Sequence, residues 1–149
     1  MFKKVVSGGQ TGVDRAALDV ALELALPCGG WCPQGRKAED GPISPRYPLT
    51  EAPSADYFQR TEWNVRDSDG TLVLTRGKPT EGTAFTIDVA KQLARPCLVL
   101  DLSEQPSPSI VHDWVKTHGI NTLNVAGPRE SKCPGIYDQA AEVLRKVLS

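Results

Sequence analysis

The chain has 149 residues, with 17 basic and 18 acidic side chains and a formal net charge of −1. This length suits one domain with its own core, and 40% hydrophobic with 23% charged residues is the balance of a folded protein. The even charge balance gives no support to binding of duplex DNA or an anionic membrane, because both attract a basic excess. We therefore expect neither a nucleic acid nor a membrane as a partner.

The apolar stretches are short. The longest, such as residues 98–100, fall far below the roughly 20 residues that cross a bilayer. The apolar part of the first strand is too short for a signal peptide and leads directly into a glycine turn. We expect a cytoplasmic protein, in which the four cysteines are reduced.

Short apolar segments that predict strands alternate with segments whose apolar residues recur every three or four positions, which predicts helices. The predicted strands are residues 2–7, 28–32, 71–75, 97–102 and 122–125. The predicted helices contain residues 13–24, 55–65, 85–93, 110–115 and 136–147. This alternation predicts one α/β domain over residues 1–149, with a three-layer Rossmann-like fold. Right-handed crossovers would place helices on both faces of a five-stranded, mainly parallel sheet.

The first strand-to-helix turn, residues 7–15, reads SGGQTGVDR. Its glycines allow a sharp bend and close approach of a ligand to the backbone, and the new helix presents free N–H groups. The positive end of the helix dipole favours an anion there. The predicted ligand-binding residues of this turn are Gly8, Gly9, Gln10, Thr11, Gly12 and Arg15. The alternative is a tight turn with Thr11 as the helix N-cap. Neither the dinucleotide-binding nor the Walker A spacing is present.

The polar segment 33–55, rich in proline and glycine, follows the second strand. Loops of this length inside a compact domain are usually functional or disordered. Gly35 and Arg36 are candidate ligand residues here, since an arginine fork suits phosphate or carboxylate, and Trp31 just before the segment could stack on a ring. The alternative is a solvated loop in which Arg36 and Lys37 pair with acidic neighbours, namely Glu39 and Asp40.

Three further loops hold candidates. Residues 75–83 form a second strand–turn–helix junction, in which Thr80, Gly82 and Thr83 could face an anion. Two such junctions on adjacent strands would flank one crevice at the carboxyl edge of the sheet. The other candidates are Asn64, Asp69 and Arg129. Each of these three could instead be a polar loop or helix-end residue.

A catalytic set and a metal site are not recognisable in the sequence. The cysteines and histidines lack the spacing of a four-ligand zinc site. Four acidic residues could supply general acid–base chemistry: Glu39, Asp40, Asp67 and Asp69. Acidic residues near a ligand loop serve equally often for positioning or solubility.

Four motifs in this order resemble the molybdenum (cofactor) carrier family. They are SGGQTGVDR at residues 7–15, GWCPQGR at 30–36 with EDG at 39–41, NVRDSDG at 64–70 and NVAG at 124–127. The resemblance runs from the first strand to the last helix. It implies a Rossmann-like fold akin to lysine-decarboxylase-like phosphoribohydrolases and DNA-processing-A-like proteins, which bind nucleotide-like ligands. Thr80-Glu81 stands where that group often has two glycines in its phosphate loop.

The resemblance implies a carrier of molybdenum cofactor, which is a pterin with a phosphomonoester and a dithiolene-bound metal oxide. It further implies that the phosphate sits at a helix N-terminus and that Trp31 stacks on the pterin. The oxo-metal end would then face Arg36, Arg129 or the second strand–turn–helix junction. By analogy we expect a homo-oligomer. Two alternatives stay open: a nucleotide or nucleoside-phosphate hydrolase, and an interaction scaffold whose loops meet a protein partner.

Overall fold

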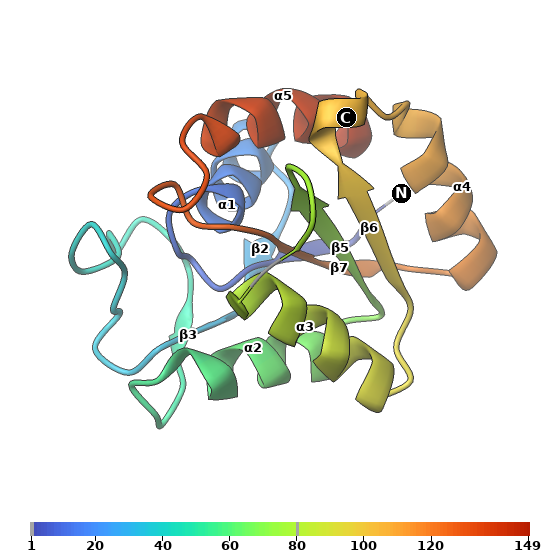
Figure 1. Ribbon diagram of the computed structural model, residues 1–149. Coiled ribbons are helices and arrows are strands. Elements are labelled where there is room, and N and C mark those ends of the chain that lie inside the picture. Colours follow the sequence, from blue (N-terminus) through green and yellow to red (C-terminus); the bar gives the residue numbers. More distant parts are fainter. Residues whose placement is uncertain (1, 80) are drawn as a thin grey trace.

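The computed structural model of the chain describes residues 2–79 and 81–149 (Figure 1). Five parallel strands form the main sheet in the order β2-β1-β7-β5-β6. Their bounds are Lys4–Val6 for β1, Cys28–Gly29 for β2, Gly70–Thr75 for β5, Cys97–Asp101 for β6 and Thr122–Ala126 for β7. All six residues of β5 are buried, as expected for an apolar strand covered on both faces.

Helices cover both faces of this sheet. They are α1 (Val13–Glu23), α2 (Tyr57–Arg66), α3 (Glu81–Gln92), α4 (Pro108–His118) and α5 (Ile136–Leu148), with a short 3-10 turn at Leu102–Glu104. Figure 1 shows α1, α4 and α5 on one side of the sheet, and α2 and α3 on the other. The predicted three-layer Rossmann-like fold is thereby confirmed. None of the described helices is long and apolar enough to cross a membrane.

The single strand predicted at residues 28–32 is divided at Gly30 into two short strands, β2 and β3. Gly30 adopts a φ of 127°, and a side chain there would collide with the carbonyl oxygen of Ser7. The chain therefore turns away from the main sheet after β2. The next two residues form β3 (Trp31–Cys32), which pairs with β4 (Thr50–Glu51) in a separate two-stranded parallel sheet.

The long segment 33–55 is a packed loop rather than an open one. Ala38, Ile43 and Tyr47 are buried in a small core of their own, against Leu18 of α1 and Cys32 of β3. This second core fixes the segment on α1. The segment therefore reaches the carboxyl edge of the main sheet with a defined shape.

Candidate functional site

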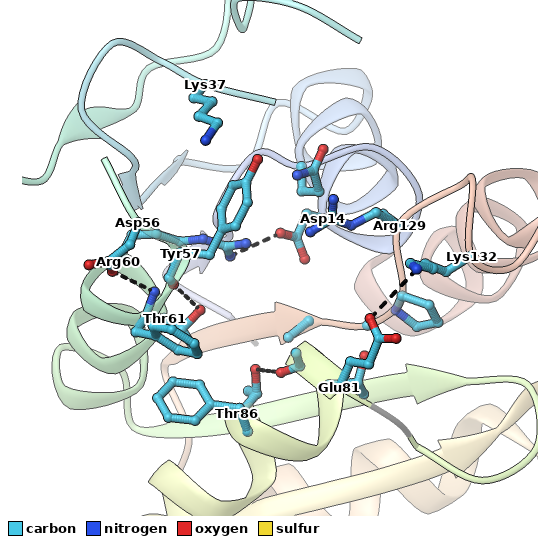
Figure 2. A pocket seen from close by; sticks show the side chains of 18 residues that line it. Asp14, Lys37, Asp56, Tyr57, Arg60, Thr61, Glu81, Thr86, Arg129 and Lys132 are labelled. Carbon is cyan, nitrogen blue, oxygen red and sulfur yellow. Dashed lines mark hydrogen bonds and ion pairs between the residues drawn. The ribbon is translucent and has the colours of Figure 1, made fainter. Parts of the chain in front are cut away.

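A cleft of about 400 Å³ lies where three loops and the starts of two helices converge at the carboxyl edge of the sheet (Figure 2). The turn after β1, the segment 33–55, the starts of α2 and α3 and the loop after β7 all contribute to its lining. This edge is where open parallel sheets bind ligands, because the helix N-termini and the connecting loops gather there.

An ion pair between buried side chains forms the floor of the cleft. Asp14, in the first turn of α1, is 3% exposed, and its carboxylate lies 3.3 Å from the Nη1 atom of Arg60 on α2. Gly8 makes room for this arginine, since a side chain at that position would collide with the guanidinium. Burial raises the pKa of Asp14, and the charge of Arg60 only partly offsets that rise.

The side-chain amide of Gln10 also lies on the cleft floor, and two hydrogen bonds fix its orientation. Its Oε1 atom accepts hydrogen bonds from the backbone N–H groups of Thr11, at 3.0 Å, and Glu39, at 2.9 Å. The Nε2 atom therefore points the other way, and it is buried without a hydrogen-bond partner among the described residues. The Nε atom of Arg60 is in the same state. Buried donors without an acceptor are rare in proteins, so two of them beside one cleft mark it as a candidate binding site.

One wall of the cleft is aromatic. Phe58 and Phe85 meet edge to face with their ring centroids 4.9 Å apart. The Tyr57 ring stands among three cationic side chains, with Arg129 at 5.1 Å, Lys37 at 5.4 Å and Arg60 at 5.5 Å from its centroid. A flat apolar surface and concentrated positive charge thus face the same space.

The rim of the cleft is formed by the start of α3 and the loop after β7. Lys132 and Glu81 face each other across it, with 3.8 Å between Nζ and a carboxylate oxygen (Figure 2). Four basic and three acidic side chains line the whole cleft: Lys37, Arg60, Arg129 and Lys132 against Asp14, Asp56 and Glu81. The balance is positive, which suits an anionic ligand.

A family model, the circularly permutated YpsA SLOG family, matches residues 5–148. The chain belongs to the circularly permutated YpsA SLOG family. The match spans nearly every residue, and it confirms the relationship that the four sequence motifs indicated.

A crystal structure of a protein from Syntrophus aciditrophicus SB, named "Putative molybdenum carrier protein", is 45% identical to this chain. The alignment covers 99% of this chain and 96% of that one, and the TM-score is 0.96. No curated protein matches the chain.

The cleft of this YpsA SLOG family member contains four of the predicted ligand residues: Gln10, Gly82, Thr83 and Arg129. Thr80, also predicted, lies outside the described residues. These four come from three different loops, so the structure does bring the first turn, the second junction and the loop after β7 to one site.

The glycines of the first turn face the protein rather than open space. A side chain at Gly9 would come within 2.6 Å of Leu49, and one at Gly12 would overlap the carbonyl oxygen of Pro128. The Thr11 hydroxyl donates to Glu39 and accepts from the Glu130 N–H group. The backbone N–H groups of Gly9, Thr11 and Val13 also donate within the protein, to Ser7, Gln10 and Pro128. These amides are therefore engaged, which corrects the expectation that they face an anion. Thr11 is not the N-cap either, because Gly12 holds that position.

Two predicted arginines brace the segment 33–55 instead of lining the cleft. Arg15 forms a forked ion pair with Asp40, at 2.9 and 3.1 Å, and this hydrogen bonding lowers the pKa of Asp40. Arg36 donates to four backbone carbonyls, those of Ile43, Ser44, Tyr47 and Leu49. Gly35 donates its N–H group to Glu51. The alternative considered for Arg36, pairing with Glu39 or Asp40, is therefore also absent from the described contacts.

Trp31 and Asn64 lie beside a different hollow, of about 330 Å³. The Asn64 side chain bridges the backbone N–H and carbonyl of Trp31, at 2.7 and 2.9 Å, and the Trp31 indole donates to Asp67. The indole also meets the Trp63 ring edge to face. Trp31 is thus held against α2, and it is not part of the lining of the main cleft.

Asp69 sits at the opposite edge of the sheet, where β5 and β7 begin. Its carboxylate accepts from the N–H groups of Asn121 and Thr122, at 3.0 and 2.9 Å. The four acids considered for catalysis are each bound by protein groups, and none is part of the described cleft lining: Glu39, Asp40, Asp67 and Asp69.

Sequence reasoning missed the first turn of α2, which supplies Tyr57 and Arg60. A signal was available. A helix that leads into a parallel strand must begin at the carboxyl edge of the sheet, so the start of the helix predicted at 55–65 belonged with the other edge loops. Asp14 was part of the quoted first motif, but its burial opposite Arg60 depends on the tertiary structure.

Proposed function

We propose that this chain binds a phosphate-bearing planar ring in the cleft and acts as a carrier of molybdenum cofactor. The observation that supports this best is the meeting of an aromatic wall with four basic side chains at one site. An apolar face suits the ring of a pterin, and positive charge suits its phosphate.

The phosphate end fits the rim of the cleft. Arg129 and Lys132 come from the loop after β7, while Gly82 and Thr83 belong to the first turn of α3. The N–H groups of a first helical turn have no partner within the helix and carry the positive end of its dipole. A phosphate at this rim would receive both kinds of stabilisation.

The ring end fits the wall. Tyr57 and Phe85 present flat surfaces to a space of about 400 Å³, within the size range of small-molecule pockets. A pterin could stack there with its polar edge towards Gln10 and Asp14.

The metal end needs no protein ligand, because the pterin dithiolene binds the molybdenum itself. The described residues hold no group of three or more His, Cys, Asp or Glu side chains that could bind a metal ion. The relative from Syntrophus aciditrophicus is named as a molybdenum carrier, which agrees with this cargo. The metal would therefore be carried through the pterin and the phosphate.

A retention assay tests the proposal. The chain is incubated anaerobically with molybdenum cofactor and passed through gel filtration, and the bound pterin is measured as its fluorescent oxidised product. The double variant R129Q/K132Q should bind at least about tenfold more weakly, because it loses charge-assisted hydrogen bonds. R145Q is the matched control, since Arg145 is a half-exposed cation on α5 that pairs with Glu23 away from the cleft.

Failure of the native chain to retain any cofactor would contradict carriage. Equal retention by the double variant would contradict the placement of the phosphate. Release of free base from nucleoside monophosphates by the same preparation would favour the hydrolase alternative instead.

A further inference from the structure

Two side chains on the cleft floor present complementary hydrogen-bonding groups. Gln10 is 5% exposed, and its Nε2 donor is buried without a partner among the described residues. Its orientation cannot reverse cheaply, because Oε1 accepts from two backbone N–H groups, those of Thr11 and Glu39. The Nε2 donor therefore has a fixed position and no acceptor among the described residues, so an acceptor on a bound ligand could pair with it.

Asp14 lies four residues further along the chain, in the first turn of α1, and presents acceptors. It is 3% exposed, lines the same cleft and has the backbone N–H of Gln10 as a neighbour. The guanidinium of Arg60, whose side chain is only 13% exposed, requires a counter-charge, which Asp14 provides at 3.3 Å. The floor thus offers a neutral donor next to an anionic acceptor.

We propose that this floor recognises the 2-amino-4-oxopyrimidine edge that pterins and guanine share, an inference that rests on the proposed binding of a phosphorylated ring. The Asp14 carboxylate accepts hydrogen bonds from the ring N–H and the 2-amino group. Gln10 Nε2 donates to the oxo group beside them. All three groups of the edge are then satisfied by side chains that the fold already holds in place.

The same arrangement disfavours adenine. Adenine carries an amino group where guanine has its oxo group, so the Gln10 donor would meet a second donor. Adenine also lacks the ring N–H and the 2-amino group that Asp14 would accept. A buried polar group left unpaired costs enough to reduce affinity by roughly tenfold to a hundredfold.

Calorimetric titration with three monophosphates tests the preference. GMP and neopterin monophosphate should bind at least tenfold more tightly than AMP. Whichever of GMP and neopterin monophosphate binds more tightly identifies the preferred ligand class, a guanine nucleotide or a pterin. Equal affinity for all three would overturn the edge recognition while leaving the proposed function intact. Binding of none of them would overturn the proposed function itself.

Two variants separate recognition from a structural role. D14N offers an amide donor in place of one carboxylate oxygen, so it should lose GMP affinity and gain affinity for XMP, whose 2-oxo group accepts that donor. Q10M keeps the length of the side chain but removes the donor. It should weaken GMP binding about tenfold and leave AMP binding unchanged or stronger, because the donor that would face the adenine amino group is gone.

D88N is the matched control, because Asp88 is exposed on α3 and lies outside the cleft lining. It should change neither preference. If D14N fails to fold, the Q10M titration still decides the proposal. An unchanged ratio of GMP to AMP affinity in folded Q10M would overturn the role of Gln10. An equal loss of affinity for every nucleotide in D14N would show that Asp14 only maintains the structure through its ion pair with Arg60.

Discussion

Glu39 shows at the scale of one residue how a loop side chain builds the site without touching a ligand. Its carboxylate accepts from the hydroxyl of Thr11 and from both the N–H and the hydroxyl of Ser131. Its own N–H group donates to Gln10. Glu39 therefore joins the segment 33–55 to the turn after β1 and the loop after β7, and it helps to orient the amide on the cleft floor.

The pKa of Glu39 predicts how this junction responds to pH. Partial burial raises the pKa, but the hydrogen bonds from Ser131 and Thr11 outweigh it, so the pKa of the folded protein lies below the ordinary value of 4.5. A depressed folded pKa means that the carboxylate stabilises the protein above the unfolded value. That stabilisation is lost as the pH falls through the folded value.

We therefore expect E39Q to lower the free energy of unfolding by about 1–2 kcal/mol at neutral pH. The difference from the native chain should shrink as the pH falls below 4.5 and vanish once the pH lies below the lowered pKa of the folded protein, as measured by urea denaturation over a pH series. E142Q is the control, because the Glu142 side chain is 72% exposed in an i,i+4 pair and should change stability little. A difference that persists unchanged in acid would contradict the assignment.

The interaction of two elements, the turn after β1 and the loop after β7, decides the role of Gly12. The strands β1 and β7 are adjacent, so the turns that follow them touch. Gly12 has a φ of 79° and packs on the backbone of Pro128 and Glu130, while Val13 donates its N–H to Pro128. The glycine is required for packing between two loops of the protein.

G12A should accordingly destabilise the chain by several kcal/mol, since the added Cβ meets a positive φ and backbone atoms rather than a flexible side chain. G82A provides the contrast, because nothing lies within 4 Å of a Cβ at that helical position. Thermal unfolding of both variants measures the difference. A native-like melting temperature for G12A would show that the two turns can separate at little cost.

The sheet order explains the cleft at the scale of the whole molecule. β7 lies between β1 and β5, so the loops after all three strands meet at one point of the carboxyl edge. The segment 33–55 and the start of α2 close that point from the side. Residues far apart in sequence, such as Gln10, Lys37 and Arg129, line one cleft for this topological reason.

The expected homo-oligomer stays a prediction at this scale. β6 is an edge strand of apolar composition, and Val99 within it is 39% exposed. Open strand edges pair readily with another chain. Multi-angle light scattering should give a mass of at least twice 16.1 kDa. A mass of one chain at micromolar concentration would contradict the expectation.

Local patterns in the sequence predicted the α/β class, the five main strands, the five helices and a site at the carboxyl edge of the sheet. Four motifs indicated the family. These follow from local periodicity and glycine turns, which are properties of short segments. Only the tertiary structure decided which polar groups are left unpaired. Arg15, Arg36 and Asp69 satisfy the backbone or a neighbouring charge. Among the described residues, by contrast, the Nε2 atom of Gln10 and the Nε atom of Arg60 have no acceptor. Pairing is settled by long-range packing, since a side chain's partners come from segments that the sequence does not place beside it.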